Sequence, residues 1–154
     1  MLKERLGDNA LQIQASNGAV TEFDGEEWFG DLDEEGIFNE QTYLIQTSAA
    51  CTILLEGMPT VVDEYEITIN PGWNWIGFPS VAPIVVIDAL ANFEAEEGDQ
   101  IQCNDATSTE FDGEEWFGDL ETFTPGQGYM YYSNSEETKI LIFSTGAKVQ
   151  GKTR

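Results

Sequence analysis

A segment of twelve residues, TEFDGEEWFGDL, occurs twice in the chain without a single difference, at Thr21–Leu32 and Thr109–Leu120. The two copies are 88 residues apart in a chain of 154 residues. Self-similarity at a fixed spacing is the sequence signature of repeated structural units. The chain is therefore expected to contain two versions of one folding unit.

The resemblance between the two copies continues more weakly outside the identical block. One corresponding pair is TYLIQTS at Thr42–Ser48 and GYMYYSN at Gly128–Asn134. The other is GDNALQIQ at Gly7–Gln14 and GDQIQ at Gly98–Gln102. The first copy has no counterpart of residues 63–97. Either the chain begins inside a repeat, or the opening half-module completes itself with another part of the fold.

These limits divide the chain into three segments. Residues 1–61 are a partial first repeat, residues 62–146 a complete second repeat, and residues 147–154 a basic C-terminal tail. We expect the three segments to form one compact unit.

The local sequence predicts short strands joined by tight turns. In both copies of the block, Phe-Asp-Gly-Glu (Phe23–Glu26 and Phe111–Glu114) predicts a hairpin turn, with Asp-Gly supplying two positive φ angles. WNWIGF follows an Asn-Pro-Gly turn and predicts a strand with Trp73 and Trp75 on one face, at least one of them in the core. Apolar residues near helical spacing predict a helix over residues 87–96. The fold class is mainly β: a pseudo-repeat of short antiparallel strands and hairpins with one short helix, barrel- or sandwich-like.

The charge distribution excludes several classes of partner. The chain has 29 carboxylates and 6 basic residues, a net charge of −23, and no Lys or Arg between Leu6 and Thr138. Nucleic acid and anionic membrane surfaces are excluded, because binding a polyanion requires Lys and Arg. Salt, divalent cations or a basic partner must relieve the repulsion. The alternative is an acidic surface that only keeps the protein soluble.

The residue inventory also limits the chemistry. The absence of His and the presence of only two Cys exclude Ser-His and Cys-His catalysis and Cys/His zinc sites. Carboxylates are abundant, but nothing singles out a catalytic pair, so we expect no enzymatic activity. Cys51 and Cys103 are expected as two buried thiols, with a bridge between them as the alternative. Apolar runs are too short for a membrane-spanning helix, and we expect no membrane insertion.

Two motifs in a set order resemble a known module. GWNWIGFP (Gly72–Pro79) is followed by LETFTPGQGYMYYS (Leu120–Ser133). This pair resembles the GWNxIxxP…PGxGYxxxS repeat module of secreted and cell-surface Bacteroidetes proteins. The resemblance implies a non-catalytic accessory or adhesion-type β module, located outside the cell or at the cell surface. It supplies no functional residues.

The identical block contains the candidate binding residues. Trp28 and Trp116 would act as flat apolar anchors, and two equivalent loops would bind one ligand with avidity. Aromatic rings beside carboxylates also suit a sugar, since rings stack on pyranose C–H surfaces and carboxylates accept hydroxyl hydrogen bonds. Recent sequence exchange between the repeats is the alternative explanation of the identity. The candidate residues are Trp28, Trp116, Glu26, Glu27, Glu114, Glu115, Asp31 and Asp119.

One acidic loop has part of a calcium-binding pattern. Asp31, Asp33, Glu35 and Asn39 occupy positions 1, 3, 5 and 9 of an EF-hand-like loop. Position 12 is Thr42, where a bidentate Glu normally belongs, and the second copy does not continue the pattern. We therefore expect no cofactor, with Ca²⁺ in this loop as the alternative.

These observations favour a non-enzymatic extracellular or cell-surface module. It would serve adhesion, binding of a protein or glycan ligand, or spacing of other domains. The alternative is an acidic effector that binds a basic protein surface, as a mimic of nucleic acid would.

Overall fold

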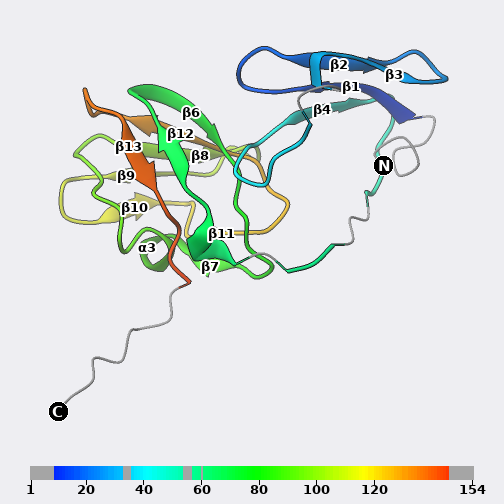
Figure 1. Ribbon diagram of the computed structural model, residues 1–154. Helices are drawn as coiled ribbons and strands as arrows, with labels where there is room; N and C mark the ends of the chain where they lie inside the picture. The colour runs from blue at the N-terminus through cyan, green and yellow to red at the C-terminus, as the bar shows by residue number, and fades with distance from the viewer. Residues whose placement is uncertain (1–8, 33–35, 54–56, 60, 146–154) are drawn as a thin grey trace. The chain divides into compact units, whose positions relative to one another are not determined.

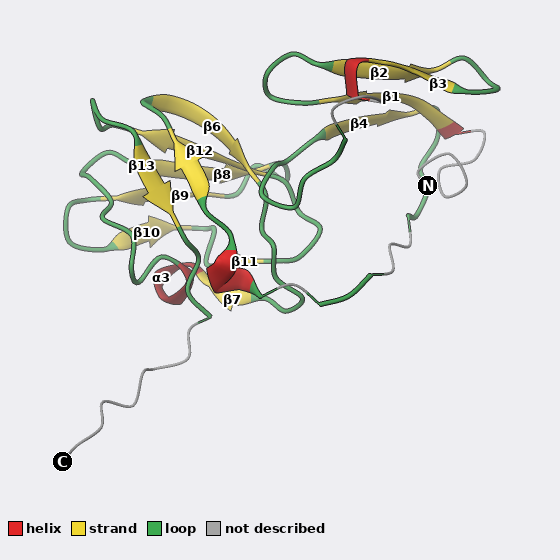
Figure 2. Cartoon of the chain, in the orientation of Figure 1, coloured by secondary structure: helices red, strands yellow, loops and turns green. Residues whose placement is uncertain are grey.

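The computed structural model describes residues 9–32, 36–53, 57–59 and 61–145 (Figures 1 and 2). These residues form thirteen strands, one α-helix and one 3-10 helix, and every paired strand is antiparallel to its neighbour. The mainly β fold with one short α-helix is confirmed, and no sheet of the described residues closes into a barrel. The chain divides into two compact units, Met1–Met58 and Pro59–Arg154. Each unit is described by itself.

The first unit is built on a four-stranded sheet. Its strands are β1 (Ala10–Gln14), β2 (Val20–Phe23), β3 (Trp28–Gly30) and β4 (Leu44–Thr47), in the order β3-β2-β1-β4. Its core is small. The buried residues are Ile13, Ala15, Ala19 and Leu32, with Trp28 and Tyr43 packed against them.

The second unit has a larger sheet of five strands. The order is β10-β9-β8-β12-β6, with β6 at Gly72–Ile76, β8 at Gln100–Cys103, β9 at Ser108–Phe111, β10 at Trp116–Gly118 and β12 at Tyr129–Ser133. Alternate residues of β12 are buried, as period-two patterning requires. One face of this sheet therefore points into the core, and the other face is partly open to solvent.

A second layer covers the inner face of the five-stranded sheet (Figure 2). It contains the pairs β13–β5 and β11–β7 and the helix α3, and the 3-10 helix η2 precedes β5. The core between the layers includes three Phe rings, Phe78, Phe123 and Phe143, with centroid separations of 5.1–5.3 Å. The bounds of these elements are η2 Val62–Glu64, β5 Ile67–Ile69, β7 Ile84–Val85, α3 Val86–Ala89, β11 Thr122–Phe123 and β13 Lys139–Leu141.

The two sheets share a strand order. The order β3-β2-β1-β4 corresponds to β10-β9-β8-β12, and β6 is the additional strand of the second unit. A tyrosine hydroxyl that accepts a hydrogen bond from a backbone N–H recurs as well. The backbone N–H of Phe38 donates to Tyr43 Oη at 3.0 Å, and the N–H of Thr124 donates to Tyr129 Oη at 2.6 Å. Among the described residues, the sheet of the first unit thus has no strand on the outer edge of β4.

The predicted helix over residues 87–96 is wrong, because α3 spans only Val86–Ala89. The following backbone is used in turns instead. The N–H of Ala95 bonds to Phe93 O at 3.1 Å, and the N–H of Glu96 bonds to Asp99 Oδ2 at 3.0 Å. A carboxylate that binds nearby backbone N–H groups competes with the helix.

The expected core position of Trp73 or Trp75 is also wrong. Trp73 is 49% exposed and Trp75 is half-buried, while Ile76 on the opposite face is fully buried. Asn74 is fixed by the preceding turn, since its Nδ2 donates to Asn70 O at 2.7 Å. The alternation was predicted correctly, but the face assigned to the core was not.

The two thiols differ in exposure. Both cysteines are free; Cys103 is buried as expected, whereas Cys51 is exposed. The expectation of two buried thiols is therefore wrong for Cys51, which lies beyond the end of β4 in a segment without a packed core of its own.

Candidate functional site

The two identical blocks fold alike. In each block a four-residue loop joins two strands, with Phe23 opposite Trp28 and Phe111 opposite Trp116. Asp24 Oδ1 accepts hydrogen bonds from the N–H groups of the two glutamates that follow, at 2.8 and 2.9 Å. Asp112 Oδ1 accepts the same pair, both at 2.8 Å.

The expected pair of positive φ angles in this turn is wrong. Gly25 and Gly113 have φ of +103° and +99°, but no other loop residue has positive φ. The loop is two residues longer than the turn that the Asp-Gly pattern predicts. The Asp side chain accepts hydrogen bonds from the backbone N–H groups of the loop glutamates.

The second glycine of each identical block lies against the backbone of the neighbouring strand. Gly30 and Gly118 have φ of +136° and +148°. A Cβ on Gly118 would lie 2.3 Å from Ser108 O, and one on Gly30 would lie 2.2 Å from Val20 O. Glycine is required at both sites, because no side chain fits there.

The rings of the candidate tryptophans lie against the cores. Trp28 packs on the small core of the first unit and Trp116 on the core of the second, and both are half-buried. The exposed rings of the block are instead Phe29 and Phe117, at 50% and 52% exposure. Aromatic area for a ligand is therefore offered by the two phenylalanines.

The candidate acidic residues lie at the surface. Glu26, Glu27, Glu114 and Glu115 are exposed in the hairpin loops, and Asp31 and Asp119 are exposed next to Leu32 and Leu120. Of the calcium candidates, Asn39 is exposed, and Asp33 and Glu35 lie outside the described residues. The described residues contain no group of three or more side chains that could hold a metal ion. Calcium binding stays a prediction.

The strand register assembles a row of side chains across the outer face of the five-stranded sheet. Directly opposite residues of antiparallel strands lie on the same face. Trp73 of β6 is opposite Tyr132, which is opposite Gln100, then Glu110, then Phe117 of β10. Four strand spacings of about 4.8 Å give this row a length of about 19 Å. We call it the aromatic row.

The two ends of the aromatic row are apolar and its middle is polar. The Trp73 and Tyr132 rings are 5.2 Å apart at an angle of 59°. Gln100 Nε2 donates to Glu110 Oε2 at 3.2 Å, which fixes both groups. The exposed Phe117 ring closes the other end of the row.

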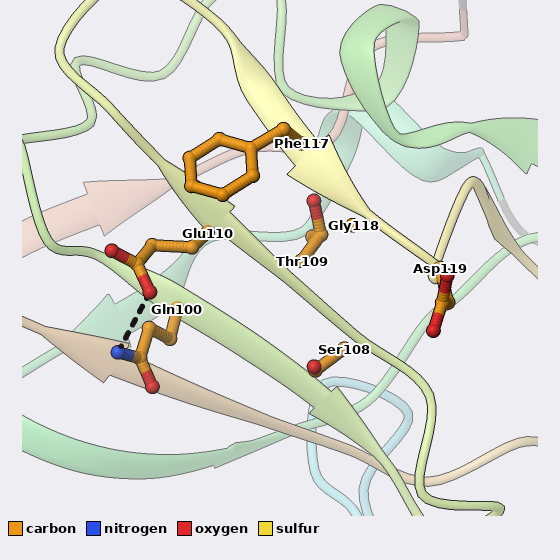
Figure 3. A pocket seen from close by; sticks show the side chains of 7 residues that line it. All are labelled: Gln100, Ser108, Thr109, Glu110, Phe117, Gly118 and Asp119. Atoms are coloured by element: carbon orange, nitrogen blue, oxygen red, sulfur yellow. Dashed lines mark hydrogen bonds between the residues drawn. The ribbon is translucent and has the colours of Figure 1, made fainter.

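A shallow pocket of about 210 Å³ lies at the Phe117 end of the row (Figure 3). Its floor is formed by β8, β9 and β10, and Asp119 lies beyond the end of β10. The side chains supply amide, hydroxyl and carboxylate groups around one exposed ring. The lining residues are Gln100, Ser108, Thr109, Glu110, Phe117, Gly118 and Asp119.

The first unit carries the same polar cluster. Gln12 is opposite Glu22, and its Nε2 donates to Glu22 Oε1 at 3.0 Å. Glu22 is opposite Phe29, as Glu110 is opposite Phe117. The counterpart of Tyr132 in this unit is Gln46, however, and within the described part of the chain no strand pairs with β4 on its other side. The complete aromatic row therefore belongs to the second unit.

The charged groups at and near the pocket are carboxylates, which accept hydrogen bonds. Two backbone N–H groups, of Glu115 and then Glu114, hold the pKa of the Asp112 carboxyl below its ordinary value. The pocket is lined by two carboxylates and no basic side chain. Such a surface suits a ligand that donates hydrogen bonds and carries no negative charge.

The sequence interpretation missed Gln100, Glu110 and Phe117. Phe117 was visible as the alternate partner of Trp116 in a strand of period two. The grouping of Gln100 with Glu110 and Tyr132 depends on which strands pair and in what register, which the local pattern does not specify.

No protein-family model matches the sequence, and no curated protein and no solved structure match it either. Within the described part of the chain, no helix has the length and apolar character needed to cross a bilayer.

Proposed function

We propose that this protein is a non-enzymatic β-rich module that binds a neutral or basic glycan on the outer face of its second unit. The aromatic row is the observation that carries the proposal. An extracellular or cell-surface location and a role in adhesion belong to the same proposal, and the GWNW and PGQGY motifs support them.

The chemistry of the row matches that of a sugar chain. A pyranose ring has apolar C–H faces, which stack on aromatic rings, and hydroxyl groups at its edge, which donate to carboxylates and amides. Trp73 and Tyr132 supply the stacking surface, and Glu110 and Asp119 supply acceptors. The net charge of −23 disfavours an acidic glycan.

A glycan array with the full chain tests this proposal. Binding should persist between about 50 and 500 mM salt, because stacking is not screened by ions. We expect Trp73→Ala and Phe117→Ala each to weaken binding at least tenfold. Val81→Ala is the matched control, since Val81 is also exposed but lies outside the row. A blank array, or equal affinity of all three variants, contradicts the proposal.

A second candidate is an acidic effector of a basic protein, and the charge distribution favours it. The described residues contain one ion pair, between Lys139 Nζ and Glu96 Oε1 at 2.7 Å. Nearly all carboxylates are thus left without a cationic neighbour in the described part of the chain. Binding to a basic protein such as a histone would then fall steeply between about 50 and 500 mM salt and would not depend on Trp73.

A further inference from the structure

The edge of β4 differs from the corresponding edge in the second unit. β4 aligns with β12, because each pairs with the strand that precedes the hairpin of the identical block, β1 or β8. On its other side β12 pairs with β6 over five residues. Among the described residues, β4 has no strand on that side.

The side chains of β4 are more exposed than the equivalent side chains of β12, which are covered both by β6 and by the second layer. Ile45 is opposite Ile13, and Tyr131 is opposite Ile101, so Ile45 and Tyr131 occupy equivalent places on the core faces. Tyr131 is fully buried, whereas Ile45 is 44% exposed. Its neighbour Leu44 is 53% exposed. The second unit thus shows that this edge is covered by an antiparallel strand when the sheet is complete.

The sequence around β4 lacks the usual protection of an edge strand. Exposed edges are normally guarded by charged residues or proline, which prevent pairing with another chain. Residues 41–55 contain no charged residue and no proline, in a chain with 35 charged residues. Two copies of a chain with a net charge of −23 repel each other over most of their surfaces. An uncharged edge is the place where they can approach.

We propose that β4 pairs with β4 of a second copy of this chain, antiparallel and about a two-fold axis. This arrangement uses the same edge on both copies and closes as a dimer, the commonest symmetry of homo-oligomers. Opposite residues lie on the same face. The proposed two-fold axis passes at Ile45, which places Ile45 opposite Ile45 of the second copy and Leu44 opposite Gln46. The two four-stranded sheets become one continuous sheet.

The interface is small, and the dimer is correspondingly weak. A stable interface buries more than about 1,000 Å², which a four-residue strand and its neighbours do not reach, so the Kd is on the order of 10–100 µM. Charge repulsion opposes association, and salt screens it. Raising the salt from about 50 to 500 mM therefore strengthens the dimer.

Analytical ultracentrifugation of the full chain tests the proposal, over about 1–500 µM protein at high salt. The wild type should show a concentration-dependent dimer, and Ile45→Glu and Leu44→Glu should each raise the Kd at least tenfold. Phe29→Glu is the matched control, because Phe29 is equally exposed but lies on β3 at the far edge of the same sheet. Circular dichroism establishes that each variant folds. A monomer at every concentration overturns the proposal.

Cross-linking tests the register independently of stability. In a Cys51→Ser background, Ile45→Cys should give a covalent dimer under mild oxidation, because directly opposite Cβ atoms are about 4.5–5.5 Å apart. Phe29→Cys in the same background should not. A dimer that survives Ile45→Glu and does not cross-link through position 45 would use another surface and refute the β4 pairing. Neither outcome depends on glycan binding.

Discussion

Replacement of Gly118 by alanine measures how tightly β10 approaches β9. The new Cβ would lie 2.3 Å from Ser108 O and 2.7 Å from Thr109 Cα, and both atoms belong to the backbone. Neither atom can move without displacing β9. The φ of +148° adds a second cost, since L residues rarely adopt this region.

The expected loss of stability follows from these two terms. A non-glycine residue in such a backbone region costs about 1–3 kcal/mol. Overpacking against rigid neighbours costs about 1–3 kcal/mol more. We expect a total near 4 kcal/mol, and each kcal/mol lowers the Tm of a unit of this size by about 4–8 °C. Gly118→Ala should therefore lower the Tm of the second unit by roughly 16–32 °C.

Gly126→Ala is the matched control for the conformational term. Gly126 has φ of +79°, and an added Cβ would meet no atom within 4 Å. Its cost should be about 1–2 kcal/mol, the penalty of left-handed backbone alone. Scanning calorimetry and urea unfolding followed by tryptophan fluorescence give both values. If Gly118→Ala costs no more than Gly126→Ala, the close approach of β9 and β10 is wrong.

Further predictions concern buried and exposed polar groups. Asp99 is fully buried and accepts three hydrogen bonds, so Asp99→Ala should lower the free energy of unfolding by more than about 3 kcal/mol. Tyr131→Phe removes one of the three donors and should lower it by about 1–2 kcal/mol. Urea denaturation measures both values. Because the pKa of Asp112 is lowered in the folded state, its carboxylate contributes fully to folding stability above about pH 4, and this contribution is lost as the pH falls through the folded-state pKa. Asp112→Ala should therefore make the free energy of unfolding fall less steeply with acidification, as measured between about pH 2 and 7. A thiol reagent should label Cys51 rapidly and Cys103 only after unfolding, which mass spectrometry of the labelled native chain resolves; equal labelling rates would contradict the burial of Cys103.

The sequence predicts those parts of the fold that depend on neighbouring residues. Period-two alternation located β6, and the Asp-Gly turns located the hairpins β2–β3 and β9–β10. The Asn-Pro-Gly turn predicted before β6 has a positive φ of +84° at Gly72. The pattern could not assign the faces, because alternation defines two faces without saying which one is covered. The second layer of β5 and β13 decides that Ile76, rather than Trp75, is buried.

The candidate site depends more strongly on contacts between distant residues. Phe117 and Glu110 are neighbours through a hairpin, and the sequence indicates such pairs once the turn is known. Trp73 joins them only because β6 pairs with β12 and β12 pairs with β8. These strands are separated by long connections, so no local pattern gives their order or register.

The structure divides the identical block into positions that the fold requires and positions that it does not. Gly30 is fixed by the close approach to β2, and Leu32 is buried in the core. Glu26, Glu27 and Phe29 are exposed, and their side chains have no packing role that fixes their identity. Sequence exchange between the units would copy the positions that the fold requires and the exposed positions alike. Selection for folding alone would keep only the positions that the fold requires. Clustered carboxylates repel one another, so each exposed glutamate opposes folding to a small extent. Their presence in both units is expected both from a shared binding role and from recent sequence exchange. Neutral variants of these glutamates should separate the two explanations, because only a binding role predicts a loss of ligand affinity without a loss of stability.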